Sequence, residues 1–374
     1  MKKSHPAIAL GLTAALSLGL SACGSAPTDS ASSSSSGGSG TSSDFMACMV
    51  SDEGGFDDQS FNQSGKDGLD RAGADFGIKT IVVQSTSDAD YQSNITSLID
   101  QGCSLIIGVG SKLAPALTSA AQTNTTINFA LIDSAFQDAS GSTVQLQNGR
   151  PLVFNTAEAA YLAGYAAAGT SKTGKVATYG GQPVPAVQMV MEGFAKGVEK
   201  YNADNGASVQ VLGWDPANPS GGSFVGDFKD AAKGQQLTEH FLSQGADIIV
   251  PAAGDAADGA LAAIKAAGGD SSAIVWVDAD GYLATDGDGG APYMLTSVIK
   301  EVGTAVYDTV DEAQRGAFSA TPYIGALGNQ GVSLAPYHDW DSKVSPELKA
   351  KVDELKKQIV NGTLNVSTAY DPAA

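Results

Sequence analysis

A cluster of acidic and aromatic side chains follows the first apolar run of the chain, in the stretch VSDEGGFDDQSFNQSGKDGL at residues 50–69. The stretch carries five acidic residues and two phenylalanines around a Gly-Gly pair. Carboxylates accept hydrogen bonds from N–H and O–H donors, and an aromatic face packs against a flat ring. The stretch is therefore either a solvated loop between a strand and a helix or one part of a ligand site.

Small residues and carboxylates recur after later apolar runs of the chain. They are Gly108-Val109-Gly110-Ser111, Asp133-Ser134, Gly180-Gly181, Gly254-Asp255, Asp278 and Asp280. One aspartate after a strand is commonly a helix cap. Several of them at equivalent positions favour a ligand site built from loops.

The elements that must position these loops alternate between short β-branched runs and helix-period segments. The predicted strands are 45–50, 80–83, 105–109, 128–132 and 152–154, then 176–179, 209–212, 248–250 and 274–277. Helices are predicted between them, including one through Phe61 and Phe76 and a last one from Ser345-Pro346 to Gly362. This order predicts two α/β lobes with parallel sheets covered by helices on both faces. Ligands of such sheets bind beyond the carboxyl ends of the strands.

The charge of the chain narrows the class of ligand. The formal net charge is −19, from 21 basic and 40 acidic residues. Such a surface repels nucleic acids and anionic lipids, so we expect no nucleic-acid partner. A neutral or cationic small molecule is the better expectation, although an acidic balance also serves solubility alone.

The N-terminus has the pattern of an export signal, predicted over residues 1–22. Lys2 and Lys3 precede an apolar run from Ala7 to Leu20, and LSAC ends it. This end resembles a bacterial lipobox, which implies cleavage before Cys23, lipidation of its sulfur and a lipid anchor on the extracytoplasmic face of the cell membrane. Residues 23–44 would form a Ser/Gly-rich tether. An ordinary secretory signal with an incidental cysteine is the alternative.

Two further cysteines, Cys48 and Cys103, lie in or beside predicted strands. In an oxidising compartment they either pair in a disulfide or remain two packed thiols.

No motif for catalysis or for a cofactor is complete. Gly164 and Gly169 have the spacing of a phosphate-binding loop, but Thr170 stands where the lysine is required. The histidines and cysteines show no zinc spacing, and no GxSxG motif occurs. We therefore predict no catalytic residue, metal or cofactor, with an enzyme built on paired carboxylates as an alternative.

Motifs along most of the chain resemble those of the basic membrane protein family of bacterial lipoproteins, the purine nucleoside receptors of ABC transport systems. The resemblance covers about residues 45–335 in order, through the stretch at 50–69, LIIGVG, FALIDS, AYLAGYAAAGTSKTGKVATYGG, VPAVQMVMEGFAKGVEKYN, FKDAAKGQQLTEHFLSQGADIIVPAAG, VDADGY and LTSVIKEVGTAVYDTV. It implies a type I periplasmic-binding-protein fold, with two doubly wound parallel-sheet lobes joined by three crossovers. The expected lobes are 45–155 plus 298–318, and 156–297 plus 319–374. It also implies a monomer that delivers its ligand to an ABC permease.

The resemblance implies ligand contacts at eight residues: Asp52, Phe61, Asn62, Asp133, Phe228, Gly254, Asp278 and Lys300. Phe61 would stack on the purine, followed by Asn62 as the family pattern requires. Asp52 would accept hydrogen bonds from the ligand, and Asp133 would read the edge of the base.

The remaining implied contacts are with the sugar and with the walls of the ligand pocket. Asp278 and Lys300 would hold the ribose hydroxyls. Phe228 would form a second aromatic wall, and Gly254 would let the backbone approach the ligand. The chain departs from the family pattern at Trp276, a ring expected to intrude on or line the pocket. The alternatives are a sugar or another small polar signal on the same scaffold, and a surface sensor or adhesion lipoprotein.

Overall fold

The strands form two six-stranded sheets in a computed structural model, which describes residues 44–268 and 271–372. The first sheet has the order β11-β5-β4-β3-β1-β2 and the second β12-β10-β9-β8-β6-β7. The strands are β1 Met46–Val50, β2 Lys79–Val83, β3 Leu105–Val109, β4 Asn128–Ile132, β5 Gly149–Phe154, β6 Lys175–Gly180, β7 Gln210–Leu212, β8 Ile248–Ala252, β9 Ala273–Asp278, β10 Met294–Lys300, β11 Tyr323–Gly325 and β12 Val332–Leu334. Pairing is parallel throughout the first sheet, and in the second only β12 is antiparallel to its neighbour.

All nine predicted strands are confirmed, with shifts of at most a few residues at their ends. Strands β10, β11 and β12 were not predicted. Thr296 and Ser297 interrupt the apolar run of β10, and the other two strands have only three residues each. Strands this short show no usable alternation.

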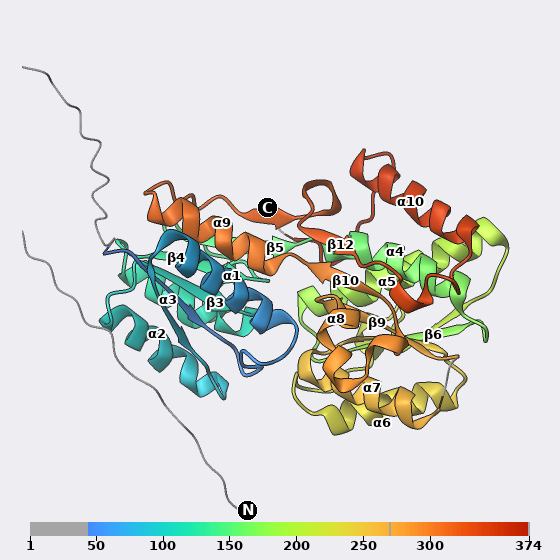
Figure 1. The fold of residues 1–374 in the computed structure, drawn as a ribbon. Coiled ribbons are helices and arrows are strands. Elements are labelled where there is room, and N and C mark those ends of the chain that lie inside the picture. The colour runs from blue at the N-terminus through green and yellow to red at the C-terminus, as the bar shows by residue number, and fades with distance from the viewer. Residues whose placement is uncertain (1–43, 269–270, 373–374) are drawn as a thin grey trace, which may run out of the picture. The chain divides into compact units, whose positions relative to one another are not determined.

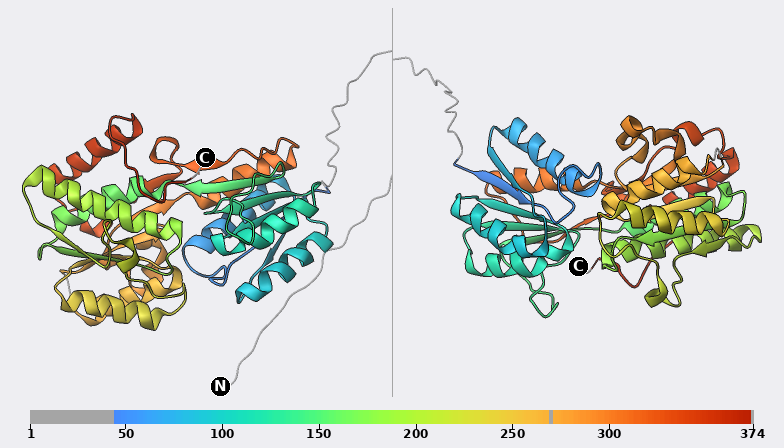
Figure 2. Two further views of the ribbon diagram at one scale, coloured as in Figure 1. Left: turned by 180° about the vertical axis from the view of Figure 1, so that it is seen from behind. Right: turned by 90° about the horizontal axis from the view of Figure 1, so that it is seen from below.

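Helices cover both faces of each sheet. Their bounds are α1 Phe61–Phe76, α2 Tyr91–Asp100, α3 Ala114–Thr123, α4 Thr156–Thr170, α5 Pro185–Asn205, α6 Ala231–Ser243, α7 Asp258–Ala266, α8 Gly281–Ala284, α9 Val302–Gln314 and α10 Pro346–Val360. The views in Figure 2 show α1 and α9 on one face of the first sheet and α2 and α3 on the other. On the second sheet α4 and α5 share one core and α6 and α7 another.

The chain crosses between the sheets three times, as expected of the fold. The crossings run from β5 to α4 and β6, from β10 to α9 and β11, and from β11 to β12. Two boundaries differ from the expected lobes. Residues 298–300 belong to β10 of the second sheet, and residues 323–325 form β11 of the first. The second crossing therefore follows Lys300, directly at the predicted site.

Helix α1 is held close to this second crossing. Figure 1 shows α1 and α9 side by side, and they are in contact. A Cβ built on Gly68 would lie 2.2 Å from the carbonyl oxygen of Gly303. Only glycine permits this approach, which sets Phe61 and the rest of the first turn of α1 near Lys300.

A disulfide joins Cys48 of β1 to Cys103, before β3, so the pairing left open by the sequence is resolved in favour of the bond. The two cysteines lie 55 positions apart, and both are buried. The bond closes a loop that contains α1, β2 and α2. It therefore ties together the part of the first sheet that carries the acidic stretch.

We expect the double variant Cys48→Ala/Cys103→Ala to lower the free energy of unfolding by about 2–4 kcal/mol, because the unfolded chain regains the entropy of a long open loop. Guanidinium denaturation of the two proteins measures the change. Ligand affinity should stay within about twofold, since both sulfurs lie in the core. Equal stability of the two proteins would contradict the prediction.

Candidate ligand-binding site

A cavity lies at the carboxyl ends of the strands of both sheets. It is lined by the loops after β1, β3 and β4 of the first sheet, by the loop after β8 and the last residues of β9 and β10 of the second, and by the N-terminal parts of α1 and α5. In each sheet the first strand of the lobe lies between the second and the third, which opens a crevice where the connections diverge. All eight residues predicted to contact ligand line this cavity: Asp52, Phe61, Asn62, Asp133, Phe228, Gly254, Asp278 and Lys300.

An ion-pair cluster joins the two sheets in the cavity wall. The Lys300 ammonium, at the end of β10, contacts the Asp133 carboxylate after β4 and lies 3.0 Å from an oxygen of Asp278 at the end of β9. Lys300 is only 6% exposed. Burial by itself would lower its pKa, but the two carboxylates outweigh burial and raise the pKa of Lys300 above its usual range. Lys300 therefore remains a cation, and it presents a donor to the cavity beside two carboxylate acceptors.

Backbone strain marks both carboxylates of this cluster. Asp133 has φ of 61° and Asp278 has φ of 71°, in the left-handed region that favours glycine. Such strain costs of the order of 1–3 kcal/mol and is characteristic of functional sites. Here it aims two aspartates at one lysine.

Two phenylalanines contribute the aromatic surface of the cavity. Phe61 is the first residue of α1, and Phe228 precedes α6. The Lys300 ammonium lies 4.8 Å from the centroid of the Phe61 ring, a cation–π contact. Gly254, with φ of 57°, packs against Phe228, and a Cβ there would lie 3.2 Å from the Phe228 carbonyl oxygen. Gly254 thus makes room for the phenylalanine as well as lining the cavity.

A second polar cluster starts at Asp58, which caps α1. Its carboxylate accepts hydrogen bonds from the backbone N–H groups of Ser60, Asn62 and Gln63. The side-chain amide of Asn62 donates to both Asp52 and Asp58, at 3.1 Å each. Its carbonyl oxygen Oδ1 is buried and has no partner among the described residues. Asp58 thus holds the first turn of α1 through the N–H groups of Asn62 and Gln63, and it also lines the cavity.

Asp52 is a buried carboxylate with an unusually high pKa. Burial raises the pKa of Asp52 to about 6, against hydrogen bonds from the Gly54 N–H and the Asn62 amide. Because this pKa exceeds the unfolded value of about 3.9, its contribution to stability is full below pH 4 and is lost as the pH rises through 6. Ionised Asp52 is therefore a cost to the ligand-free fold at neutral pH.

We expect Asp52→Asn to raise the free energy of unfolding of ligand-free protein by about 1–3 kcal/mol at pH 7.5, because the buried charge is removed. The gain should vanish near pH 4, where Asp52 of the wild type is already protonated. Urea denaturation of both proteins at the two pH values gives the comparison. A gain that is the same at both would show that the charge is not its cause.

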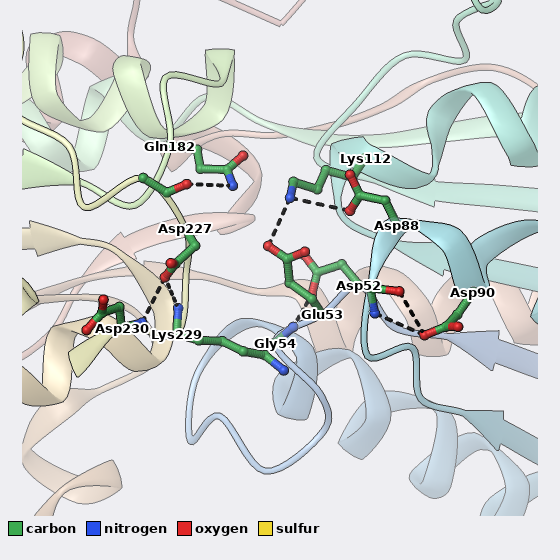
Figure 3. Close-up of polar contacts among 12 residues, drawn as sticks. Asp52, Glu53, Gly54, Asp88, Asp90, Lys112, Gln182, Asp227, Lys229 and Asp230 are labelled. Carbon is green, nitrogen blue, oxygen red and sulfur yellow. Dashed lines mark hydrogen bonds and ion pairs between the residues drawn. The ribbon is translucent and has the colours of Figure 1, made fainter. Parts of the chain in front are cut away.

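Figure 3 shows acidic groups and lysines on loops of both lobes, and one of these lysines, Lys112, lines the cavity. Lys112 of the first lobe pairs with Glu53 at 2.9 Å and with Asp88 at 3.4 Å. On the other lobe Asp227 accepts hydrogen bonds from the backbone N–H groups of Lys229 and Asp230, which lower its pKa. Lys112 also lowers the pKa of Asp227, so charges of the two lobes act on each other here.

The structure corrects the expectation for Trp276. Its ring is 2% exposed and packs in the core of the second lobe with Tyr179 and Met294, while its neighbours Val277 and Asp278 line the cavity. Asp255 and Lys112 also line the cavity. Asp255 was expected among the residues that follow a strand but not among the eight ligand contacts, and Lys112 was not expected at the site. Their position in the loops after β8 and β3 was visible, but those loops contain many polar residues that a sequence does not rank.

Three further expectations concern the lipid anchor, membrane-spanning segments and metal sites. Cys23 and the rest of the predicted signal and tether up to residue 43 lie outside the described residues. Within the described ranges, no helix is long and apolar enough to cross a membrane. The same ranges contain no group of three or more His, Cys, Asp and Glu side chains arranged to hold a metal ion.

Comparison with known proteins bears on this cavity. The profile of the family described as ABC transporter substrate-binding protein PnrA-like matches residues 45–368. The chain is 32% identical to the ABC transporter nucleoside-binding protein BmpA of Lactococcus lactis, over 88% of this chain and 92% of that protein. It is 33% identical to the CD4+ T-cell-stimulating antigen of Listeria monocytogenes, over 98% and 99% of the two chains.

The fold has solved counterparts. A solute-binding protein of an ABC transporter system from Aeropyrum pernix K1 superimposes with a TM-score of 0.76. The alignment covers 87% of this chain and 94% of that protein at 23% identity. At this identity the similarity establishes the fold, a two-lobed solute-binding architecture.

Proposed function

The chain belongs to the family of PnrA-like ABC transporter substrate-binding proteins, and from that membership we propose that it captures a purine nucleoside and delivers it to the permease of an ABC importer. The observation that carries the proposal is the cavity itself. It combines two aromatic rings, from Phe61 and Phe228, with the cluster of Lys300, Asp133 and Asp278. A flat heterocycle joined to a polyol matches this pairing of surfaces.

The aromatic rings would bind the base. A ring stacked on Phe61 or Phe228 gains dispersion and shape selection without needing a charge. The relative from Lactococcus lactis is named as a nucleoside-binding protein, which supports the same ligand class.

The ion-pair cluster would bind the sugar. The ribose 2′- and 3′-hydroxyls are donors to carboxylates and acceptors from an ammonium, so Asp278 and Lys300 complement a cis-diol. Asp133 was expected to read the base edge. Lys300 contacts both Asp133 and Asp278, so we propose that Asp133 also accepts hydrogen bonds from the sugar hydroxyls. The edge of the base would then face Asp52 and Asn62.

Transport requires binding and release without chemical change. In this proposal the ligand bridges residues of both lobes and favours the closed state by binding it more tightly. We propose a monomer held at the extracytoplasmic face of the cell membrane by acyl chains on Cys23. Electrophoretic mobility and mass of the protein from cells, compared with Cys23→Ser, test the anchor.

Calorimetric titration tests the ligand class. Full-length protein in detergent is unfolded in guanidinium and refolded to remove bound ligand, then titrated with guanosine, inosine, adenosine, cytidine, ribose and galactose. We expect binding of purine nucleosides and none of free ribose. Binding of a sugar alone, or of none of the six, would refute the nucleoside assignment. Conversion of a bound nucleoside to free base would identify an enzyme.

A further inference from the structure

Asp255 contributes a carboxylate to the cavity wall, and it is not one of the eight expected ligand contacts. It follows Gly254 in the 3₁₀ turn Gly254–Ala257 after β8, so it belongs to the second lobe. Its side chain is half-buried and has no hydrogen bond or ion pair with any residue in the ranges 44–268 and 271–372. A carboxylate of this kind in a cavity wall is free to accept donors from a ligand.

The charges around Asp255 are mostly of its own sign. Burial, and after it the carboxylates of Asp58, Asp258 and Asp52, together raise the pKa of Asp255 to about 6. Lys229 is the cation that acts against them. Asp52 and Asp58 come from the first lobe and Asp255 from the second. Carboxylates of both lobes therefore influence one another across the cavity.

Asn62 independently indicates that a ligand supplies a hydrogen-bond donor in this region of the cavity. It is 3% exposed, lines the cavity, and leaves its carbonyl oxygen without a partner in the described structure. Its amide nitrogen faces two carboxylates, which determines which end of the amide is the oxygen. A buried acceptor without a donor is costly, and a ligand N–H would satisfy it.

This region of the cavity thus presents acceptors: the carboxylates of Asp52 and Asp255 and the carbonyl oxygen of Asn62. We propose that Asp255 is a specificity-determining ligand contact, and that with Asp52 and Asn62 it selects a purine whose edge carries adjacent N–H donors. The inference rests on the proposed nucleoside function and deepens it.

Guanine is the purine with that edge. Its N1–H and 2-amino group are neighbouring donors, a match for carboxylates. Hypoxanthine keeps N1–H but lacks the amino group. Adenine places the acceptor N1 beside its single amino group, so one lone pair would face a carboxylate. The expected order of affinity is guanosine, then inosine, then adenosine.

The test is the ratio of guanosine to inosine affinity, measured calorimetrically on refolded full-length protein at pH 7.5. We expect wild type to bind guanosine at least tenfold more tightly than inosine, since a site built for a donor rejects the analogue that lacks it. Asp255→Ala should reduce the ratio to about threefold or less. Asp255→Asn, which keeps the shape and loses the charge, should lie between the two.

Asp258→Asn is the matched control. Asp258 is an exposed residue in the first turn of α7, three positions from Asp255, and its own pKa is raised by partial burial of the carboxylate and by Asp288. Asp258→Asn removes one negative charge, as Asp255→Asn does. It should leave the ratio of guanosine to inosine affinity within about twofold of wild type.

A second readout is the pH dependence of the ratio. Protonation of Asp255 and Asp52 near pH 6 removes acceptors, so the wild-type ratio should fall from pH 7.5 to pH 5. Asp255→Ala should show a smaller fall. A ratio that Asp255→Ala leaves unchanged, or an equal loss of both nucleosides, would overturn the specificity role while the nucleoside function stood. Absence of nucleoside binding by wild type would refute both.

Discussion

Replacing Lys300 with methionine should abolish nucleoside binding, with a loss of affinity of at least a hundredfold. The ammonium lies 3.0 Å from Asp278 and contacts Asp133, and it is almost fully buried. Its removal takes away the donor proposed for the sugar hydroxyls. It also leaves two carboxylates side by side without a counter-charge, and uncompensated buried charge costs about 3–5 kcal/mol of stability. Calorimetric titration and urea denaturation measure the two effects.

The controls separate binding from folding. Lys175→Met removes a partly exposed lysine, distant from the cavity lining, whose ammonium donates to the Gln244 carbonyl oxygen at 2.8 Å, and it should change neither quantity. If Lys300→Met does not fold, Asp278→Ala removes one sugar acceptor and should weaken binding by at least tenfold. Unchanged affinity in Asp278→Ala would show that the sugar does not lie at this cluster.

Phe61→Ala should weaken guanosine, inosine and adenosine to a similar degree, by about tenfold to a hundredfold. Base–aromatic stacking contributes roughly 1–3 kcal/mol by alanine substitution and depends little on which base stacks. Phe61 lines the cavity at the first position of α1, and Asp58 caps that turn independently of the ring. The fold of the helix should therefore survive the substitution, and calorimetry on the three nucleosides should report a common loss.

Phe76→Ala tests whether any large-to-small change in α1 has the same effect. Phe76 lies at the other end of the helix, with its ring centroid 4.9 Å from that of Tyr307. We expect it to lower stability and to leave affinity within about twofold. A loss of affinity in Phe61→Ala that is confined to one base would argue against stacking and for a directional contact.

The alternation of short strands and helices was sufficient to predict two α/β lobes. Local patterns were enough for nine of the twelve strands and for most helices, because periodicity and caps are visible within a few residues. In α10, for example, Ser345 caps the helix and Leu348, Val352, Leu355 and Ile359 are buried. Loops after parallel strands meet at one edge, so the acidic stretch at 50–69 and the later loops could be assigned to a common site. The eight predicted ligand contacts, all of which line the cavity, came from a family resemblance in addition to this pattern.

Tertiary structure alone decided how those residues pair. Asp133 and Lys300 are 167 positions apart, and only the second crossing after β10 brings them into contact. The sequence placed Asp255 after a strand, but it did not show that Asp255 stays unpaired in the cavity while Asp230 caps α6.

Trp276 shows why orientation could not be read from β9. Both faces of the second sheet are covered by helices, so apolar residues alternate without a polar face to mark the outside. The Trp276 ring lies on the face covered by α6 and α7, away from the cavity. It packs there beside Met294 and against Gly281, which has no side chain to obstruct it. The sequence by itself determined the lobes and the edge where a ligand binds, because these follow from local periodicity and chain order. Which carboxylates remain free to meet that ligand depended on contacts between distant segments, which only the folded chain makes.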